Sequence, residues 1–375
     1  MLFSQIINHE DTKSLLIRAV QTNHVAHALL FDSPVGGAGL ALAWAFATYI
    51  NCEDKQPTDA CGRCASCIKM RKLVHPDYYQ IFPLPRTPKE GEDLMAELTP
   101  AWRSFLEESP YRTLSDWLVH INATNNQQGI IPVKESRQII SKLSLKSFEG
   151  EYKIMLLWQP ELLNIQAANA LLKILEEPPT KTLFLLVTNQ SDKLLTTIIS
   201  RTQRVAVKAF SDKEVMEHLI QKGVAEQQAK HIAYLAEGNM AEALRSLKEA
   251  DGQSPHEWFA NWLRKCYLHD YDALVKLADE FDNVGKEKQK GRFDYALSIL
   301  RDLFLLKNDA TPLLRLADEE LDFIKKLSGS ISIPAFENII TEISEGYYHL
   351  ERNARAKILF LDISLFVARV LKPLY

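Results

Sequence analysis

Five short apolar runs, separated by stretches with helical character, constrain the fold of the first 207 residues more than any other feature. The runs IMLLW and LFLLV are apolar on both faces, which is typical of parallel strands that helices cover on both sides. Strands that alternate with helices predict a doubly wound α/β domain. The five expected strands are residues 26–31, 78–82, 153–158, 182–188 and 203–207.

A glycine-rich turn follows the first expected strand, where nucleotide-binding α/β proteins carry a phosphate-binding loop. The sequence FDSPVGGAGLALA at 31–43 reads as a strand end, a turn and a helix start. An active loop ends in Gly-Lys-Ser/Thr, with the lysine on the β- and γ-phosphates and the hydroxyl on Mg²⁺. Gly39 and Leu40 occupy the lysine and hydroxyl positions. We expect the glycines to serve packing, with weak anion binding at the helix start as the alternative. The degenerate loop consists of Ser33, Pro34, Gly36, Gly37 and Gly39.

The strand at 153–158 lacks the acids that a P-loop ATPase needs at this point. In such enzymes acidic residues at the end of a buried strand hold Mg²⁺ and activate water. Trp158 and Gln159 occupy these positions, and neither side chain performs either task. The sequence therefore predicts no ATP hydrolysis by this chain alone.

Four of the five cysteines lie within sixteen residues of one another. Zinc prefers four thiolates in a tetrahedron, and a Cys-x2-Cys spacing lets two sulfurs face one ion. A disulfide pair or unliganded thiols are the alternatives, and the lack of an apparent export signal disfavours disulfides. We expect a structural zinc with no open position and no catalytic role, so that His75 is not needed as a ligand. The expected ligands are Cys52, Cys61, Cys64 and Cys67.

Strand signals end at residue 207, and the rest of the chain reads as helix. Ser211 and Glu214 form an expected capping box that opens a small helical domain. A break near residue 250 precedes a longer helical region. We expect an α/β domain at 1–207 with a cysteine module at 52–67 and an insert at 84–129, a small helical domain at 208–250, and a helical domain at 251–375.

The insert interrupts the alternating pattern with four prolines. Thr99 as N-cap and Pro100 in the first turn predict a helix start within it. We expect a partly helical surface elaboration and no site.

These motifs, in this order, resemble the delta-prime family of bacterial DNA polymerase III clamp-loader subunits, which are AAA+ proteins. The resemblance covers residues 1 to about 250, whereas the C-terminal helices match only in length and helical character. It rests on HALLFDSPVGGAG, the four cysteines, HPDYY at 75–79, NALLKILEEPP at 169–179 and ISRTQR at 199–204.

The resemblance implies an AAA+ P-loop domain, a small helical lid domain and a C-terminal helical collar domain in a five-subunit ring. It further implies a non-hydrolysing stator that acts with ATP-hydrolysing gamma/tau motor subunits and the delta subunit. Together they would load the sliding clamp onto primed DNA. The family's arginine finger, supplied in trans to a neighbouring ATP site, corresponds to Arg201 with Ser200 beside it. Ala241 stands where active members carry a lid-domain arginine.

Composition and charge weigh against two other functions. The net charge of −4 gives no general basic field for nucleic acid, and no basic and aromatic residues cluster near the cysteines. This disfavours a zinc-dependent nucleic-acid-binding protein. An active AAA+ ATPase with an aberrant loop is disfavoured because the lysine, the acids and the lid arginine are all missing. The sequence also has no run of about 18 apolar residues that would span a membrane. We expect a cytoplasmic protein.

Overall fold

The computed structural model describes residues 1–372 except 90–91, 124–128, 135–140, 144–145, 249–254, 312–313, 315, 317, 330–332 and 353. The chain folds into two compact units. One unit contains Met1–Lys222 and Ala236–Leu244, and the other contains Gly223–Leu235 and Arg245–Tyr375. The expected domain boundary at 250 lies outside the described residues, so the division into three domains stays a prediction.

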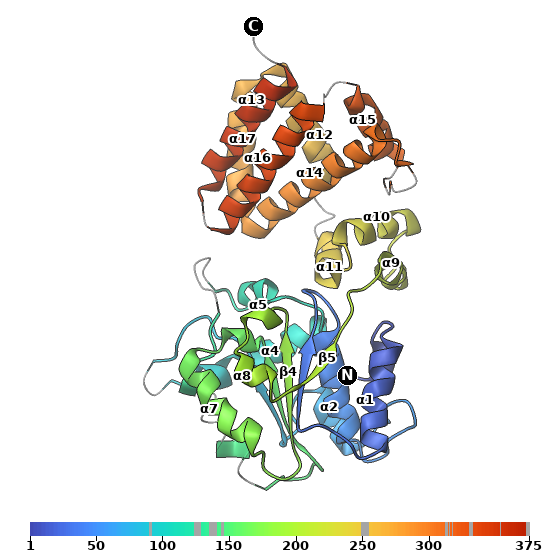
Figure 1. The fold of residues 1–375 in the computed structure, drawn as a ribbon, viewed down its shortest axis with the longest axis vertical. Coiled ribbons are helices and arrows are strands. Elements are labelled where there is room, and N and C mark those ends of the chain that lie inside the picture. The colour runs from blue at the N-terminus through green and yellow to red at the C-terminus, as the bar shows by residue number, and fades with distance from the viewer. Residues whose placement is uncertain are drawn as a thin grey trace. The chain divides into compact units, whose positions relative to one another are not determined.

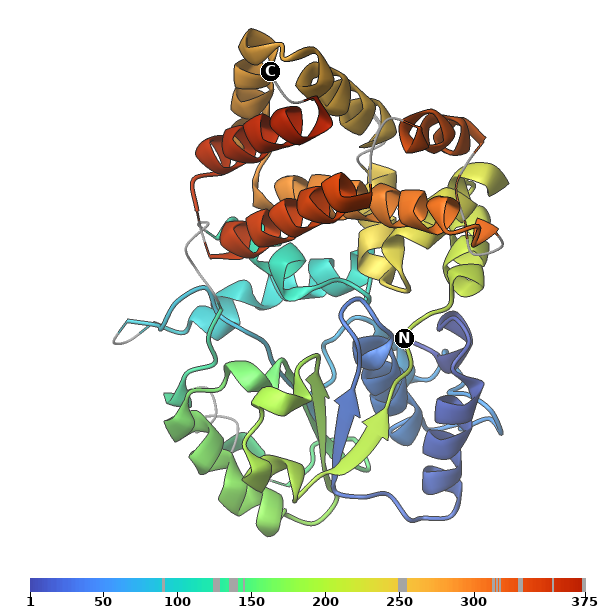
Figure 2. The same cartoon turned by 45° about the horizontal axis from the view of Figure 1, so that its top comes forward.

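A five-stranded sheet forms the centre of the first unit, with strand order β2-β3-β4-β1-β5 (Figure 1). Every neighbouring pair is parallel. All residues of β3 and β4 are buried, because helices lie on both sides of the sheet in both views (Figures 1 and 2). The predicted parallel α/β core is thus confirmed, and each strand end lies within two residues of its expected place. The strands are β1 Ala28–Asp32, β2 Tyr78–Ile81, β3 Lys153–Trp158, β4 Thr182–Thr188 and β5 Gln203–Ala206.

The helix that follows the glycine loop, α2 Gly39–Ile50, is buried along its whole length. Its sequence contains no charged residue, which is typical of a helix that has no solvent-facing stripe. The capping box at Ser211 and Glu214 is present at the start of α9. The other α-helices are α1 Glu10–Gln21, α3 Ala65–Arg71, α4 Leu94–Glu108, α5 Leu114–His120, α7 Ile165–Glu176, α8 Thr196–Ile199, α9 Asp212–Gln221 and α11 Met240–Lys248, whose first half belongs to this unit.

The main helix of the insert, α4, begins six residues before the expected position. Asp93 is its N-cap and accepts a hydrogen bond from the Ala96 N–H at 3.1 Å. Thr99 lies inside the helix, where its hydroxyl donates to the Met95 carbonyl at 2.8 Å, and Pro100 is an interior residue. The predicted start was wrong because an earlier acid satisfies the first-turn amides. Residues 90–91 and 124–128 of the insert lie outside the described chain.

The insert contributes to the core of the first unit, which the sequence did not predict. Helices α4 and α5 bring Trp102, Phe105 and Trp117 against Phe82 and against Trp158 at the end of β3. The ring centroid of Trp102 lies 4.7 Å from that of Phe82, 5.3 Å from that of Trp117 and 5.1 Å from that of Trp158. All five rings are buried. We call these five residues the aromatic cluster.

The second unit is helical throughout the part that the structure describes. Trp258, Trp262, Phe281 and Phe360 lie in its core, and the Phe281 and Phe360 rings stack with centroids 4.4 Å apart. The Trp262 indole donates to the Ser364 hydroxyl at 2.9 Å. No described helix in either unit is both long enough and apolar enough to span a membrane. The helices are α10 Glu226–Ala236, α12 Pro255–Leu268, α13 Tyr271–Asn283, α14 Lys286–Lys307, α15 Asp318–Ser328, α16 Ile333–Glu351 and α17 Ala356–Leu371.

We expect Trp102→Ala to lower the free energy of unfolding by about 3–5 kcal/mol, because it opens a cavity at the centre of the aromatic cluster. Val119→Ala on α5 is the control, since Val119 is 70% exposed and its truncation should cost less than about 0.5 kcal/mol. Denaturant unfolding of both variants measures the difference. Equal midpoints would show that the insert is not part of the core.

Candidate functional site

The glycine loop between β1 and α2 is held by its own hydrogen bonds. The Gly39 N–H donates to the Ser33 hydroxyl at 3.2 Å, and the Gly37 N–H donates to the Pro34 carbonyl at 3.0 Å. A Cβ atom on Gly37 would lie 2.6 Å from Ser33 Oγ, and one on Gly39 would lie 2.7 Å from Ser33 Cβ. Leu40 is buried in α2. Two amides that would face phosphate in an active loop are therefore engaged inside this one.

The start of α11 packs directly against the same loop. Gly36 has a φ of +69°, and a Cβ atom there would lie 1.8 Å from Asn239 Oδ1. The Met240 N–H donates to the Gly36 carbonyl at 3.2 Å. Asn239 Oδ1 also accepts the Glu242 N–H at 3.2 Å, as an N-cap does, and Ala241 is buried. Only glycine fits at position 36, because both its backbone conformation and its neighbour exclude a side chain.

The two positions expected for catalytic acids carry uncharged side chains with structural contacts. Trp158 belongs to the aromatic cluster. Gln159 is 5% exposed and has a left-handed φ of 58°, and its amide donates to Asn189 Oδ1. Asn189 Nδ2 donates in turn to the Ser33 carbonyl at 2.8 Å and to the Pro34 carbonyl at 3.1 Å. A chain of hydrogen bonds thus links the ends of β3 and β4 to the glycine loop.

One half-buried acid beside these strand ends was missed by the sequence analysis. Glu161 follows Pro160 in a 3-10 helix and accepts the Thr188 hydroxyl at 2.9 Å and the Asn189 N–H at 3.2 Å. Burial raises the pKa of Glu161 above its ordinary value. An acid three residues past a strand end is the only sequence signal for it. Both carboxylate oxygens of Glu161 accept hydrogen bonds from residues at the end of β4, so the described contacts of this acid join the 3-10 helix to that strand.

Arg201 lies two residues beyond the end of α8, and its guanidinium is hydrogen-bonded to neighbouring groups of the same unit. Its Nε donates to Glu176 Oε1 at 2.8 Å, and its Nη2 contacts the same oxygen. Its Nη1 donates to the Thr197 carbonyl at 2.9 Å and to the Ser200 hydroxyl at 3.3 Å. The side chain remains 31% exposed and faces an open hollow of about 670 Å³. The hollow is also lined by His27, Leu175 and Gln203.

Arg201 and the glycine loop lie at opposite ends of the sheet. Gln203, just after Arg201, pairs with Leu29 near the start of β1, whereas the loop follows the end of that strand at Asp32. A strand rises ~3.3 Å per residue, so β1 places roughly 15 Å between the two features. Arg201 is therefore too far away to act on a ligand at its own chain's loop.

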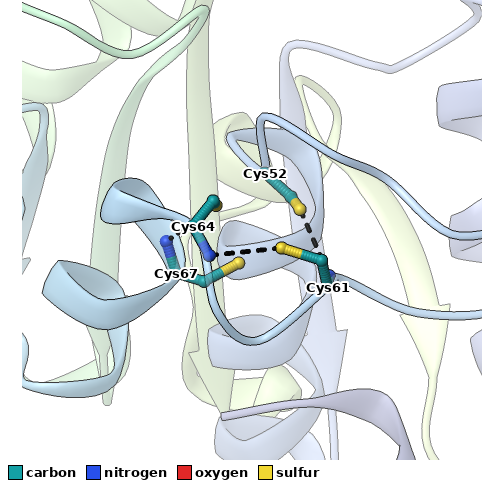
Figure 3. A group of neighbouring side chains, drawn as sticks. All are labelled: Cys52, Cys61, Cys64 and Cys67. Atoms are coloured by element: carbon teal, nitrogen blue, oxygen red, sulfur yellow. Dashed lines mark hydrogen bonds between the residues drawn. The ribbon is translucent and has the colours of Figure 1, made fainter.

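The four clustered cysteines come together in space (Figure 3). Their sulfurs all lie within 4.8 Å of one another, and all five cysteines of the chain are free. Backbone N–H groups donate to three of the sulfurs at 3.3–3.4 Å. Backbone hydrogen bonding, led by the amide of Arg63, lowers the pKa of the Cys61 thiol to about 7, whereas burial raises those of Cys52 and Cys67. The module contains the donor set that a tetrahedral metal ion requires.

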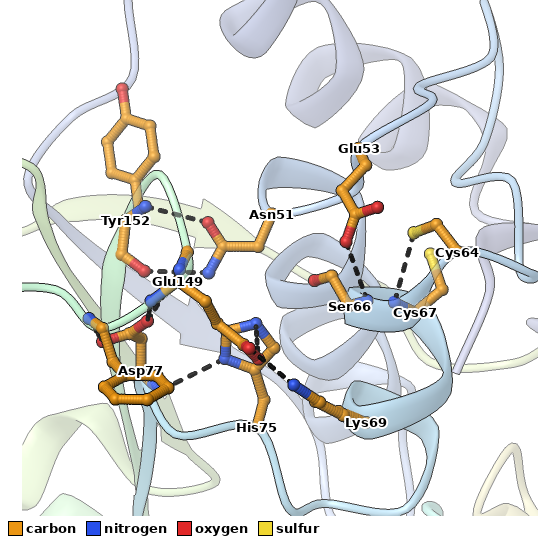
Figure 4. Close-up of polar contacts among 12 residues, drawn as sticks. Asn51, Glu53, Cys64, Ser66, Cys67, Lys69, His75, Asp77, Glu149 and Tyr152 are labelled. Atoms are coloured by element: carbon orange, nitrogen blue, oxygen red, sulfur yellow. Dashed lines mark hydrogen bonds and ion pairs between the residues drawn. The ribbon is translucent and has the colours of Figure 1, made fainter.

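His75 and Asp77 of the HPDYY motif connect this module to the start of β3 (Figure 4). The Asp77 carboxylate accepts the backbone N–H groups of residues 148–150 at 2.7–2.8 Å. His75 is buried, and its Nε2 lies 3.5 Å from Glu149, which also pairs with Lys69 on α3. Burial lowers the pKa of His75. The histidine therefore belongs to a structural network. Among the described residues, the cluster that could hold a metal ion consists of the four cysteines and does not include His75.

Comparison with known proteins gives a consistent match over the α/β unit. Residues 8–211, more than half of the chain, match the family model described as "DNA polymerase III, delta subunit". The chain is 33% identical over 186 residues to the DNA polymerase III subunit delta' of Yersinia pestis, which covers 50% of this chain and 43% of that protein.

Two further relatives carry related names. The delta' subunit of Escherichia coli K12 is 29% identical over 186 residues, with the same coverage of 50% and 43%. The tau subunit of Bacillus subtilis is 28% identical over 254 residues, which is 66% of this chain and 37% of that protein. The matched stretches therefore span less than half of these relatives' own lengths.

We expect Gly36→Ala to destabilise the chain by about 2–4 kcal/mol, because it combines left-handed strain with a collision against Asn239. Gly223→Ala is the matched control: its φ is +88° and no atom lies within 4 Å of the added Cβ, so it should cost only about 1 kcal/mol. Thermal or denaturant unfolding of both variants gives the comparison. Equal losses would mean that α11 does not pack on the loop as described.

Proposed function

The chain belongs to the DNA polymerase III delta-subunit family, and on that premise we propose that it is a stator of a replicative clamp loader that does not hydrolyse ATP. Gly39 and Leu40 supply neither the lysine nor the hydroxyl of an active loop. Trp158 and Gln159 have no charge with which to hold Mg²⁺ or activate water. The internal hydrogen bonds of the loop further support the proposal, since they leave fewer amides for a nucleotide.

The position of Arg201 is the observation that carries the proposal. Its side chain is partly exposed on an open hollow and lies a strand's length from the chain's own loop. An arginine supplied in trans stabilises the charge on a transferring phosphoryl group and is worth ~10³–10⁵ in rate, or about 4–7 kcal/mol. We assign Arg201, with Ser200 beside it, as the arginine finger for a neighbouring subunit. A subunit without its own ATPase is still needed when it completes the next site.

The proposed partners are the gamma/tau motor subunits and the delta subunit, in a hetero-oligomeric ring. That ring would load the sliding clamp onto primed DNA in the cytoplasm. Relatives named tau and delta' support this assembly. We propose that residues 1–207 and 208–250 form the AAA+ module and that the helices of 251–375 form the collar. The net charge of −4 supports contact with DNA through the assembly.

We also propose that Cys52, Cys61, Cys64 and Cys67 hold one structural zinc ion. Zn–S bonds of ~2.3 Å in a tetrahedron place the sulfurs about 3.8 Å apart, and the four sulfurs lie within 4.8 Å of one another. Four thiolates leave no open position, so the ion would join the end of α2 to α3 and take no part in catalysis.

Metal analysis of the purified chain should find about one zinc per chain, and Cys64→Ser should remove it. Cys266→Ser is the control, because Cys266 is buried in the core of the second unit, whereas the cysteine module belongs to the first. Wild-type chain purified without chelator that contains no zinc would contradict the assignment.

Arg201→Ala in the reconstituted complex should leave assembly intact and lower clamp- and DNA-stimulated ATP hydrolysis at the adjacent site by ~10³-fold or more. Arg204→Ala is the matched control, since it removes an exposed arginine three residues away. Steady-state ATPase and gel filtration provide the two measurements. Unchanged hydrolysis would rule out the finger, and ATP turnover by the isolated wild-type chain would rule out the stator.

A further inference from the structure

Arg201 is oriented by one acid at the end of α7. Glu176 is the last residue of that helix, and its Oε1 receives both Nε, at 2.8 Å, and Nη2 of the guanidinium. The Thr197 carbonyl receives Nη1 at 2.9 Å. A guanidinium has five N–H donors, and its contacts with the described residues use at most four of them. At least one donor on Nη2 is therefore left for an acceptor outside the chain.

Glu176 occupies an electrostatically unfavourable place unless Arg201 is beside it. An acid at a helix C-terminus faces the negative end of the helix dipole. The preceding residue, Leu175, is buried and fixes the backbone at the end of α7, so the carboxylate extends from an anchored position toward a long and flexible arginine.

Glu176 could either orient Arg201 or keep it away from a phosphate. The strength of the ion pair, compared with that of the arginine–phosphate interaction, decides between these two roles. The two side chains are 31% and 47% exposed, and an exposed ion pair changes an equilibrium by at most about fivefold. A trans arginine is worth ~10³–10⁵-fold at the transition state. The carboxylate is thus too weak to hold the guanidinium back, but it restricts where the guanidinium lies before a phosphate arrives.

We propose that Glu176 is the positioning residue for Arg201, an inference that rests on the proposed function. It fixes the Nε edge of the guanidinium and leaves the distal end directed to the hollow that the neighbouring subunit's triphosphate would enter. Removing it lets the arginine sample other rotamers, which lowers the rate of hydrolysis without changing how tightly the neighbour binds ATP.

The test is steady-state ATPase of the reconstituted full-length complex with variants of this chain. Glu176→Ala should lower kcat by about three- to fivefold with an unchanged KM for ATP. Glu176→Gln should recover most of the rate, because its amide oxygen still accepts the Nε–H. Glu151→Gln is the control and should leave kcat unchanged, although it removes a somewhat more exposed ion pair with Lys181 and a longer one with Lys55.

A double-variant cycle separates positioning from a general structural effect. In the Arg201→Ala background, Glu176→Ala should cause no further loss. An additional loss there, an unchanged kcat in the single variant, or a raised kcat would overturn the inference. If Arg201→Ala itself has no effect, the finger is wrong and the positioning role falls with it. If Arg201→Ala lowers hydrolysis and Glu176→Ala does not, only the positioning role is wrong.

Discussion

The parallel pairing of β1 with β4 on one side and β5 on the other is the constraint on which both candidate sites depend. It brings the segments after β1, β3 and β4 to one edge of the sheet, where the glycine loop, Gln159 and Asn189 meet. It also places the segment before β5, with Arg201, at the opposite edge. One chain therefore presents an uncharged loop at one end of its sheet and a partly exposed arginine at the other.

The positions that carry acids in a P-loop ATPase hold groups that pack or pair without charge in this chain. A buried carboxylate or ammonium without a partner costs several kcal/mol, so uncharged side chains avoid that cost at these buried positions. Trp158 is uncharged and packs in the aromatic cluster. Gln159 is also uncharged, and its side-chain amide donates a hydrogen bond to Asn189 Oδ1. The insert therefore stabilises the α/β unit from the same strand end that an ATPase would use for chemistry.

The strands were predictable because IMLLW and LFLLV must be buried on both faces wherever they lie. The proximity of the four cysteines was likewise predictable, because short spacings limit how far apart the sulfurs can be. The start of α4 was missed because Asp93 and Thr99 both suit an N-cap, and local sequence does not rank them. Glu161 and the pairing of Glu176 with Arg201 depend on contacts 25 or more residues apart along the chain, which no local pattern encodes.

The crowding around Gly39 limits which residues can replace it. Any side chain there begins 2.7 Å from Ser33 Cβ and 3.3 Å from a methyl group of Val187, so a lysine at this position requires the surrounding atoms to move. A lone Gly39→Lys substitution would therefore lose stability, and Trp158 and Gln159 would still offer no charge to Mg²⁺. Tight packing at one glycine thus couples the shape of the loop to the residues that position 39 can accept.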